Sequence, residues 1–306
     1  MKTPPRRRIL IALFAFAVLG FIRPSHAAEP LDVVATFSIL GDITREVGGG
    51  RVRVHALVGA NGDAHVYQPT PADAKRLAQA RVVVTNGLAF EGWMDRLVKA
   101  AGYRGAVVVA SRGVPALKMR HAGSNADERH GDADPHAWQD VANVRRYAEN
   151  IAAALTMADP DGAATYRANA AAYLARLDAL ETEIRTAVRG IAPQRRKVVT
   201  SHDAFGYFAR AYGLQFIAPV GVTTDAEASA ADVAKLIRQI RQERIPAVFV
   251  ENISDPRLLQ RVKAETGAKI GGTLYSDTLS PAGGPAATYL DMMRHNLRTL
   301  AAALAP

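Results

Sequence analysis

The sequence predicts an α/β protein with two lobes, in which parallel-type sheets are wrapped by helices and one long rigid helix joins the lobes. Short apolar strands alternate with helical segments in both halves, one amphipathic segment in the middle is much longer than the rest, and 306 residues suffice for two medium domains. We expect an N-terminal lobe over residues 28–162, the linking helix over 163–189 and a C-terminal lobe over 190–306.

The first half of the chain alternates between strands and helices. We expect strands at 32–36, 51–58, 81–85 and 106–110, with helices at 39–47, 71–80 and 91–100. This alternation is typical of a parallel sheet covered by helices. A polar stretch at 118–133 interrupts it, and a helix is expected again over 138–157.

The middle of the chain carries the most regular helical pattern. Apolar residues recur every three or four positions, at Tyr166, Ala170, Tyr173, Leu177, Leu180, Ile184 and Val188. A helix from residue 163 to 188 would be about 39 Å long, and a helix of that length can act as a rigid strut between two lobes. Beyond it, strands are expected at 197–200, 246–250 and 269–274, and helices at 203–212, 229–244, 256–266 and 285–303.

Residues 1–27 have the pattern of a secretory signal. A basic start precedes the apolar run 9–22, and Ser25-His26-Ala27 is a small-x-small cleavage site, so the chain is expected to be secreted and the mature chain to begin near Ala28. The alternative is an uncleaved membrane anchor, for which the apolar run is short. This leader contains five basic residues and no acidic one, so its removal lowers the net charge from +9 to +4. The basic balance therefore does not indicate a nucleic-acid partner.

The chain contains no cysteine. This excludes disulfides, thiolate zinc sites and a cysteine nucleophile, and it predicts that no lipid is attached to an N-terminal cysteine.

The stretch from His130 to Asp140 contains the first candidate metal ligand. Asp134 is expected to cap a helix, with Pro135 in its first position and His136 in its first turn. The positive end of a helix favours neutral imidazole, which is the form that binds metals. From this motif alone, a capped helix with an incidental histidine is an equally good interpretation.

Four side chains follow a strand or begin a helix, two in each expected lobe: His65, His136, His202 and Asp277. Ligands of open α/β sheets bind beyond the carboxyl ends of the strands, so the crevice between the lobes could collect all four. Three neutral imidazoles and one carboxylate form a closed four-coordinate set that suits Zn(II). Three neighbouring carboxylates could orient the rings, namely Asp63, Asp134 and Asp203, although helix capping is the favoured interpretation for each.

At these motifs the sequence resembles the zinc- and manganese-binding solute receptors of bacterial ABC importers. The resemblance covers most of the mature chain and rests on His65-Val66-Tyr67-Gln68-Pro69, Asp134-Pro135-His136-Ala137-Trp138, His202-Asp203-Ala204-Phe205-Gly206-Tyr207, Tyr212-Gly213-Leu214 and Tyr275-Ser276-Asp277. It implies two lobes joined by a long helix and a metal ion held by His65, His136, His202 and Asp277. Manganese-type members usually place a carboxylate where His202 stands, so the histidine favours zinc.

The resemblance also implies partners. It implies a cognate ABC permease in the inner membrane that receives the ion, with a periplasmic zinc chaperone as a further candidate partner and a monomeric receptor. Zinc receptors often carry a histidine- and acid-rich insertion near residues 118–133, where this chain has His121 and His130. Either these two histidines capture zinc, or the loop is solvated and has no such role.

Three other functions compete with a zinc receptor. A manganese receptor of the same family is the nearest. A zinc hydrolase would need an open fourth coordination position, which Asp277 would close, and the sequence has no Gly-x-Ser-x-Gly or His-Glu-x-x-His motif. A surface adhesin with an incidental metal is the third. We therefore expect a binding protein rather than an enzyme.

Overall fold

The computed structural model describes residues 29–119, 133–222, 224 and 228–305. Two four-stranded sheets form the two lobes, with strand orders β2-β1-β3-β4 and β6-β5-β7-β8, and all their pairings are parallel. The prediction of two parallel-sheet α/β lobes is confirmed. Within the described residues, no helix is long and apolar enough to cross a membrane.

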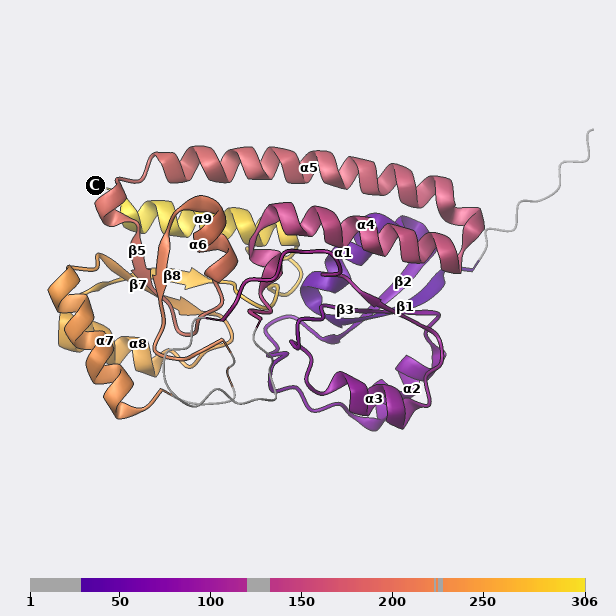
Figure 1. Cartoon of the computed structure of the whole chain (residues 1–306), viewed down its shortest axis with the longest axis horizontal. Helices are drawn as coiled ribbons and strands as arrows, with labels where there is room; N and C mark the ends of the chain where they lie inside the picture. The colour runs from indigo at the N-terminus through magenta and orange to yellow at the C-terminus, as the bar shows by residue number, and fades with distance from the viewer. Residues whose placement is uncertain (1–28, 120–132, 223, 225–227, 306) are drawn as a thin grey trace, which may run out of the picture.

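The N-terminal lobe follows the expected alternation. Its strands are β1 (Leu31–Phe37), β2 (Val52–Val58), β3 (Val82–Thr85) and β4 (Ala106–Val109), and its helices are α1 (Ser38–Gly48), α2 (Pro71–Gln79), α3 (Met94–Ala101) and α4 (Val141–Ala158). A buried Val-rich strand such as β3 has helices on both faces, as parallel sheets require. In Figure 1, α1 and α4 lie on one side of this sheet and α2 and α3 on the other.

The second sheet contains one strand that the sequence did not indicate. Its strands are β5 (Lys197–Val199), β6 (Gln215–Ile217), β7 (Ala247–Glu251) and β8 (Lys269–Leu274), and its helices are α6 (Gly206–Tyr212), α7 (Ala230–Glu243), α8 (Arg257–Thr266) and α9 (Tyr289–Leu304). The strand β6 is only three residues long, too short to show a periodicity of its own, and it pairs with β5 at the edge of the sheet.

The linking helix α5 (Ala163–Arg189) has 27 residues and buries the seven apolar residues that the periodicity selected. At 1.5 Å per residue it is about 40 Å long. It runs along one side of the molecule over both lobes and contacts α1, α4 and α9 (Figure 1).

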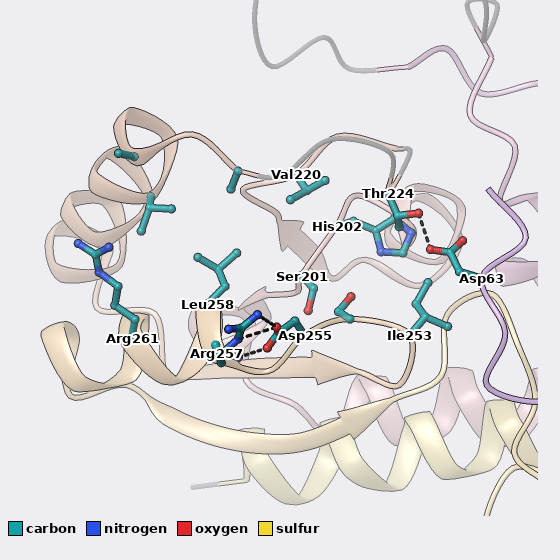
Figure 2. A pocket seen from close by; sticks show the side chains of 14 residues that line it. Asp63, Ser201, His202, Val220, Thr224, Ile253, Asp255, Arg257, Leu258 and Arg261 are labelled. Carbon is teal, nitrogen blue, oxygen red and sulfur yellow. Dashed lines mark hydrogen bonds and ion pairs between the residues drawn. The ribbon is translucent and has the colours of Figure 1, made fainter. Parts of the chain in front are cut away.

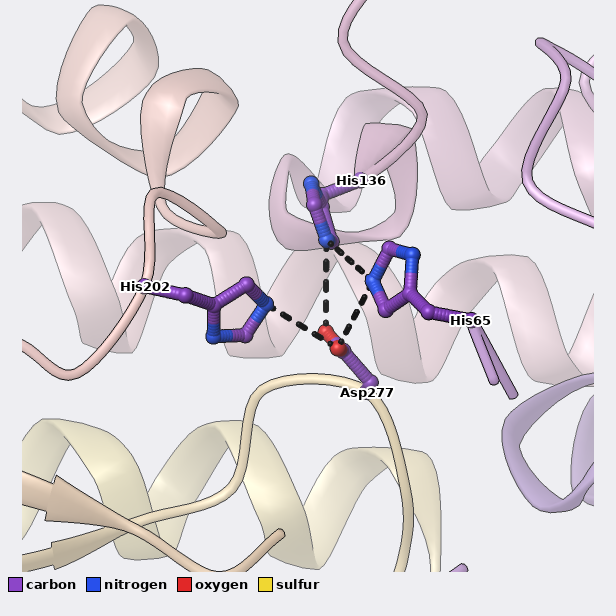
Figure 3. A group of neighbouring side chains, drawn as sticks. All are labelled: His65, His136, His202 and Asp277. Atoms are coloured by element: carbon purple, nitrogen blue, oxygen red, sulfur yellow. Dashed lines mark hydrogen bonds and ion pairs between the residues drawn. The ribbon is translucent and has the colours of Figure 1, made fainter. Parts of the chain in front are cut away.

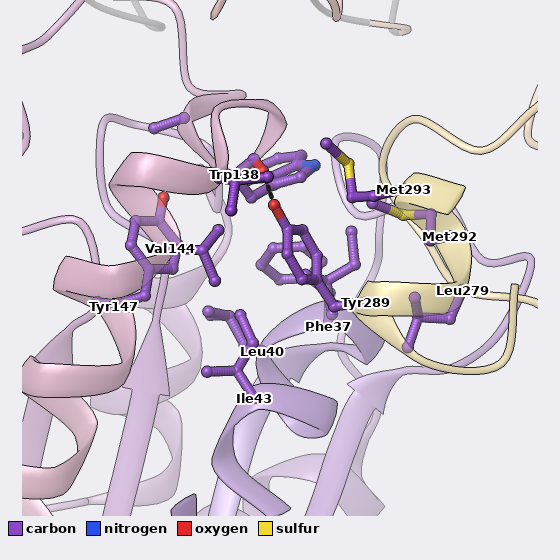
Figure 4. Close-up of a cluster of buried hydrophobic side chains, with 14 of the residues drawn as sticks. Phe37, Leu40, Ile43, Trp138, Val144, Tyr147, Leu279, Tyr289, Met292 and Met293 are labelled. Atoms are coloured by element: carbon purple, nitrogen blue, oxygen red, sulfur yellow. Dashed lines mark hydrogen bonds between the residues drawn. The ribbon is translucent and has the colours of Figure 1, made fainter. Parts of the chain in front are cut away.

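The largest apolar core extends across both lobes. It includes residues of β1, α1, α4, α5 and α9, whereas a second, smaller cluster lies between the second sheet and the helices α7 and α8. Figure 4 shows where the lobes share the large core: Tyr289, the first residue of α9, packs beside Trp138, and its hydroxyl donates to the Trp138 carbonyl oxygen at 2.8 Å. The start of the last helix is therefore joined to the N-terminal lobe.

Candidate metal centre

The four predicted ligand residues come together at one point between the lobes. His65 lies in the loop after β2, His136 lies directly before the short 3₁₀ helix Ala137–Gln139, and His202 and Asp277 follow β5 and β8. One ligand atom from each lies within 4.8 Å of all the others (Figure 3). The side chain of His65 is 2% exposed, and those of the other three are 0–1% exposed.

The spacing of these atoms fits one small cation. His65 Nε2 and His202 Nε2 lie 3.2 Å and 3.1 Å from Asp277 Oδ2, and His136 Nε2 lies 3.6 Å from Asp277 Oδ1. His65 Nε2 and His136 Nε2 are 3.3 Å apart. A tetrahedral Zn(II) with bonds of about 2.0–2.1 Å holds its ligands about 3.3 Å apart, so these four distances are close to the separation that a shared ion requires.

The charge of Asp277 is buried without a hydrogen bond. Neither of its oxygens has a hydrogen-bond partner among the described residues. Burial alone would raise the pKa of Asp277, but the neighbouring imidazoles of His202 and His136 outweigh it and hold the pKa well below its usual value. The enclosed carboxylate therefore needs positive charge beside it, which a protonated imidazole or a bound cation can supply.

The histidines differ in how readily they take up a proton. Burial lowers the pKa of His65, which favours the neutral ring that a metal needs. Burial acts in the same direction on His202, but the carboxylates of Glu251 and Asp277 outweigh it and raise the pKa of His202 well above its usual value. A metal ion at this site would therefore have to displace a proton from His202.

Asp134 does not cap a helix, and that sequence-based expectation was wrong. Its Oδ1 accepts from the backbone N–H of His136 at 2.9 Å and lies 2.8 Å from His136 Nδ1. His136 therefore stands before a 3₁₀ turn, and α4 begins only at Val141, with Asp140 as its N-cap. The carboxylate of Asp134 instead closes a local turn around His136 and contacts its ring.

The other two candidate orienting carboxylates act differently. Asp63 contacts the backbone of its histidine: Oδ1 accepts from the His65 N–H at 2.9 Å, and Oδ2 accepts from the Thr224 hydroxyl at 2.5 Å. Beside His202, the carboxylate that faces the ring belongs to Glu251, whose Oε2 lies 2.7 Å from Nδ1. Asp203, next in sequence, donates its backbone N–H to the Gly221 carbonyl oxygen.

Glu251 is the functional residue that sequence reasoning missed. It is the last residue of β7, beside β5, and is 1% exposed. The signal was present, because a carboxylate at the carboxyl end of a buried parallel strand meets the same criterion that selected His202.

Hydrogen bonds fix the loops that carry the ligands. The Trp93 indole donates to the Ala64 carbonyl oxygen beside His65, and the Asn86 amide donates to the Pro135 carbonyl oxygen beside His136. Trp138 and Gln139 both donate to the Ser276 carbonyl oxygen beside Asp277. The backbone beside His65, His136 and Asp277 is thus held by side chains from distant parts of the chain.

A cleft of about 590 Å³, lined by residues of the second lobe and by Asp63 of the first, reaches His202 at the edge of the candidate metal centre. Figure 2 shows His202 and Asp63 at one end of it and Arg257 and Arg261 of α8 toward the other. The proposed capture residues His121 and His130 lie outside the described residues.

Comparison with known proteins identifies the family. Residues 33–303 match the family described as "ZnuA: Zinc-uptake complex component A periplasmic". This chain belongs to that family. Its members are substrate-binding receptors of metal ABC importers, which confirms the expectation of a receptor rather than an enzyme and places the chain outside the cytoplasm with a permease as its partner.

Relatives of this ZnuA-family chain are named for different metals. The chain is 35% identical over 280 residues to the manganese-binding lipoprotein MntA of Halalkalibacterium halodurans (92% of this chain, 90% of that protein) and 33% identical over 290 residues to the iron-binding protein YfeA of Yersinia pestis (95% and 91%). The solved periplasmic zinc-binding protein TroA of Treponema pallidum has a TM-score of 0.83 at 31% identity, over 91% of this chain and all of that one. Several relatives, MntA among them, are named as lipoproteins, which conflicts with our expectation that this chain has no lipid anchor.

Proposed function

We propose that this protein is a periplasmic Zn(II) receptor that holds its ion with His65, His136, His202 and Asp277 and delivers it to an ABC permease. The observation that supports this most directly is the set of three imidazole nitrogens and one carboxylate around a single point, with each side chain at most 2% exposed. Such a closed, nitrogen-rich set matches the coordination that zinc prefers.

A manganese receptor is the second candidate. It is supported by the names of relatives such as MntA and by the two oxygens of Asp277, which both face the histidines and could raise the coordination number. Manganese prefers more oxygen ligands than zinc, so the third imidazole argues for zinc.

The decisive measurement is the metal content of the protein purified from its own periplasm. We expect zinc in the parent protein and little metal in His202→Ala. Manganese as the main bound metal in the parent would overturn the assignment to zinc.

Competition titrations in vitro need a matched variant, because most nitrogen and oxygen sites bind zinc more tightly than manganese. His202→Glu replaces the third imidazole by a carboxylate at the same place. We expect the ratio of zinc to manganese affinity to fall in this variant relative to the parent protein. An unchanged ratio would show that His202 does not select the metal.

Delivery and location complete the proposal. The rigid strut α5 limits how far the lobes can separate, so release is proposed to depend on docking to the permease. The receptor is proposed to act as a monomer after cleavage of residues 1–27 and without a cysteine-linked lipid, since the sequence contains no cysteine. The intact mass of the periplasmic protein tests both leader cleavage and lipid attachment.

Capture of zinc by His121 and His130, directly or from a periplasmic chaperone, is the remaining part of the proposal. Deletion of residues 120–131 should then slow zinc uptake at low zinc concentrations. Uptake and affinity equal to those of the parent protein would contradict it.

A further inference from the structure

One oxygen of the Glu251 carboxylate contacts backbone N–H groups, and the other contacts the ring of His202. Its Oε1 accepts from two consecutive backbone N–H groups, those of Ser201 at 2.8 Å and His202 at 2.9 Å. Its Oε2 lies 2.7 Å from His202 Nδ1, a close ion-pair contact rather than a straight hydrogen bond. Because both oxygens are engaged, the orientation of the carboxylate is fixed.

When His202 binds a metal through Nε2, its Nδ1 needs a hydrogen-bond acceptor. A metal ion at the centre takes the lone pair of Nε2, the atom that faces Asp277 at 3.1 Å. The remaining proton of a neutral imidazole then sits on Nδ1 and must be donated. Neither nitrogen of this buried ring has a hydrogen-bond partner among the described residues, so Glu251 is the acceptor nearest to Nδ1.

We propose that Glu251 is a positioning residue for metal binding and that a carboxylate, not merely a polar side chain of the same shape, is required there. The inference rests on the proposed role of His202 as a ligand. A glutamine at 251 must turn its amide oxygen toward the two backbone N–H groups, since only an acceptor serves there. Its NH₂ group then faces Nδ1, so that two donors meet when Nε2 holds a metal.

Asp134 provides the matched control. It also orients a ligand ring, but a single oxygen, Oδ1, serves both the backbone N–H and the Nδ1 of His136. An asparagine at 134 can present its amide oxygen at that position and keep both contacts. The same change from carboxylate to amide is therefore expected to be harmful at Glu251 and mild at Asp134.

The test compares zinc affinities of the full chain and of Glu251→Gln, Asp134→Asn and His202→Ala by competition with a chromophoric chelator. We expect Glu251→Gln to lose about 10–100-fold in affinity and Asp134→Asn to lose less than about tenfold. The visible absorption spectrum of bound Co(II) gives a second readout: Glu251→Gln should resemble His202→Ala, and Asp134→Asn should resemble the parent protein.

The possible outcomes separate this inference from the proposed function. Two outcomes would overturn the inference alone. In the first, zinc affinity is lost in His202→Ala but nearly full in Glu251→Gln. In the second, Glu251→Gln and Asp134→Asn lose equal affinity. Full affinity in His202→Ala would overturn the ligand set and the inference together.

One measurement needs no variant to fold. In the zinc-loaded parent protein, the Nδ1 proton of His202 should give a slowly exchanging proton resonance, assigned by isotope labelling of histidine. Its absence would overturn the role of Glu251 as acceptor.

Discussion

The carboxyl group of Asp42 offers a quantitative test of how the lobes are joined. It lies on α1, is 7% exposed, and accepts from the backbone N–H of Tyr289 at 2.8 Å, at the start of α9. Burial, more than any other cause, raises the pKa of Asp42 from 3.8 to about 6. The perturbation is Asp42→Asn, which stays neutral at every pH and whose amide oxygen can still accept from Tyr289.

The sign follows from proton linkage. The folded protein holds the Asp42 proton more tightly than the unfolded chain does, so ionisation destabilises the fold. The stabilising contribution of the protonated carboxyl is fully present below pH 3.8 and is lost as the pH rises through about 6. A shift of about 2 pKa units at 1.36 kcal/mol each gives about 3 kcal/mol.

The assay is urea unfolding of both proteins in EDTA between pH 3.5 and 7.5. The free energy of unfolding of Asp42→Asn minus that of the parent protein isolates Asp42 from every other titrating group. We expect this difference to rise by about 3 kcal/mol across the range, with most of the rise between pH 4 and 6.5. A difference that is independent of pH, or that falls as the pH rises, would refute the reasoning.

Three further predictions concern the metal centre. Asp277→Asn keeps the shape of the side chain but removes its charge, so added zinc should no longer raise the melting temperature, and a shift equal to that of the parent protein would contradict the role of Asp277. Because the pKa of His202 is raised well above its usual value, zinc affinity measured by calorimetry should increase with pH through the neutral range, and this dependence should weaken in His202→Ala. Trp138→Phe removes the indole donor to the Ser276 carbonyl oxygen, which should lower the free energy of urea unfolding by about 1 kcal/mol and weaken zinc binding modestly. If neither the stability nor the zinc affinity changes, this bond does not position the Asp277 loop.

The sequence predicts most of the fold because its signals are local. Apolar runs and the three-and-four spacing along α5 reflect burial of single elements, and the structure buries those same residues. The strand β6 escaped prediction because its three residues form a strand only through pairing with β5. The start of α4 was misplaced because Asp134, a good helix cap by residue type, closes a turn around His136 instead.

The candidate site likewise contains residues that the sequence predicts and residues that it does not. His65, His136, His202 and Asp277 stand in short motifs whose residue types already suggest metal chemistry. Their orienting partners are less accessible to sequence reasoning, since contact between Glu251 and His202 depends on β5 and β7 being neighbours in the sheet. Asp203 was considered because it follows His202 in sequence. Glu251 faces the His202 ring because the two strands are neighbours in the sheet.

The contacts of Asp277 do not follow its place in the chain. By sequence it belongs to the C-terminal half, yet its loop is bonded to the N-terminal lobe: the Ser38 hydroxyl accepts from the Leu279 N–H at 3.0 Å, and the Thr278 hydroxyl donates to the Gly59 carbonyl oxygen at 3.1 Å. The Asp277 loop thus shares a framework with the loops of two of the histidines. His202 is held by Glu251, within the second sheet. We therefore expect the proposed ion to link His202, which is held within the second sheet, to three residues whose loops are bonded to the N-terminal lobe.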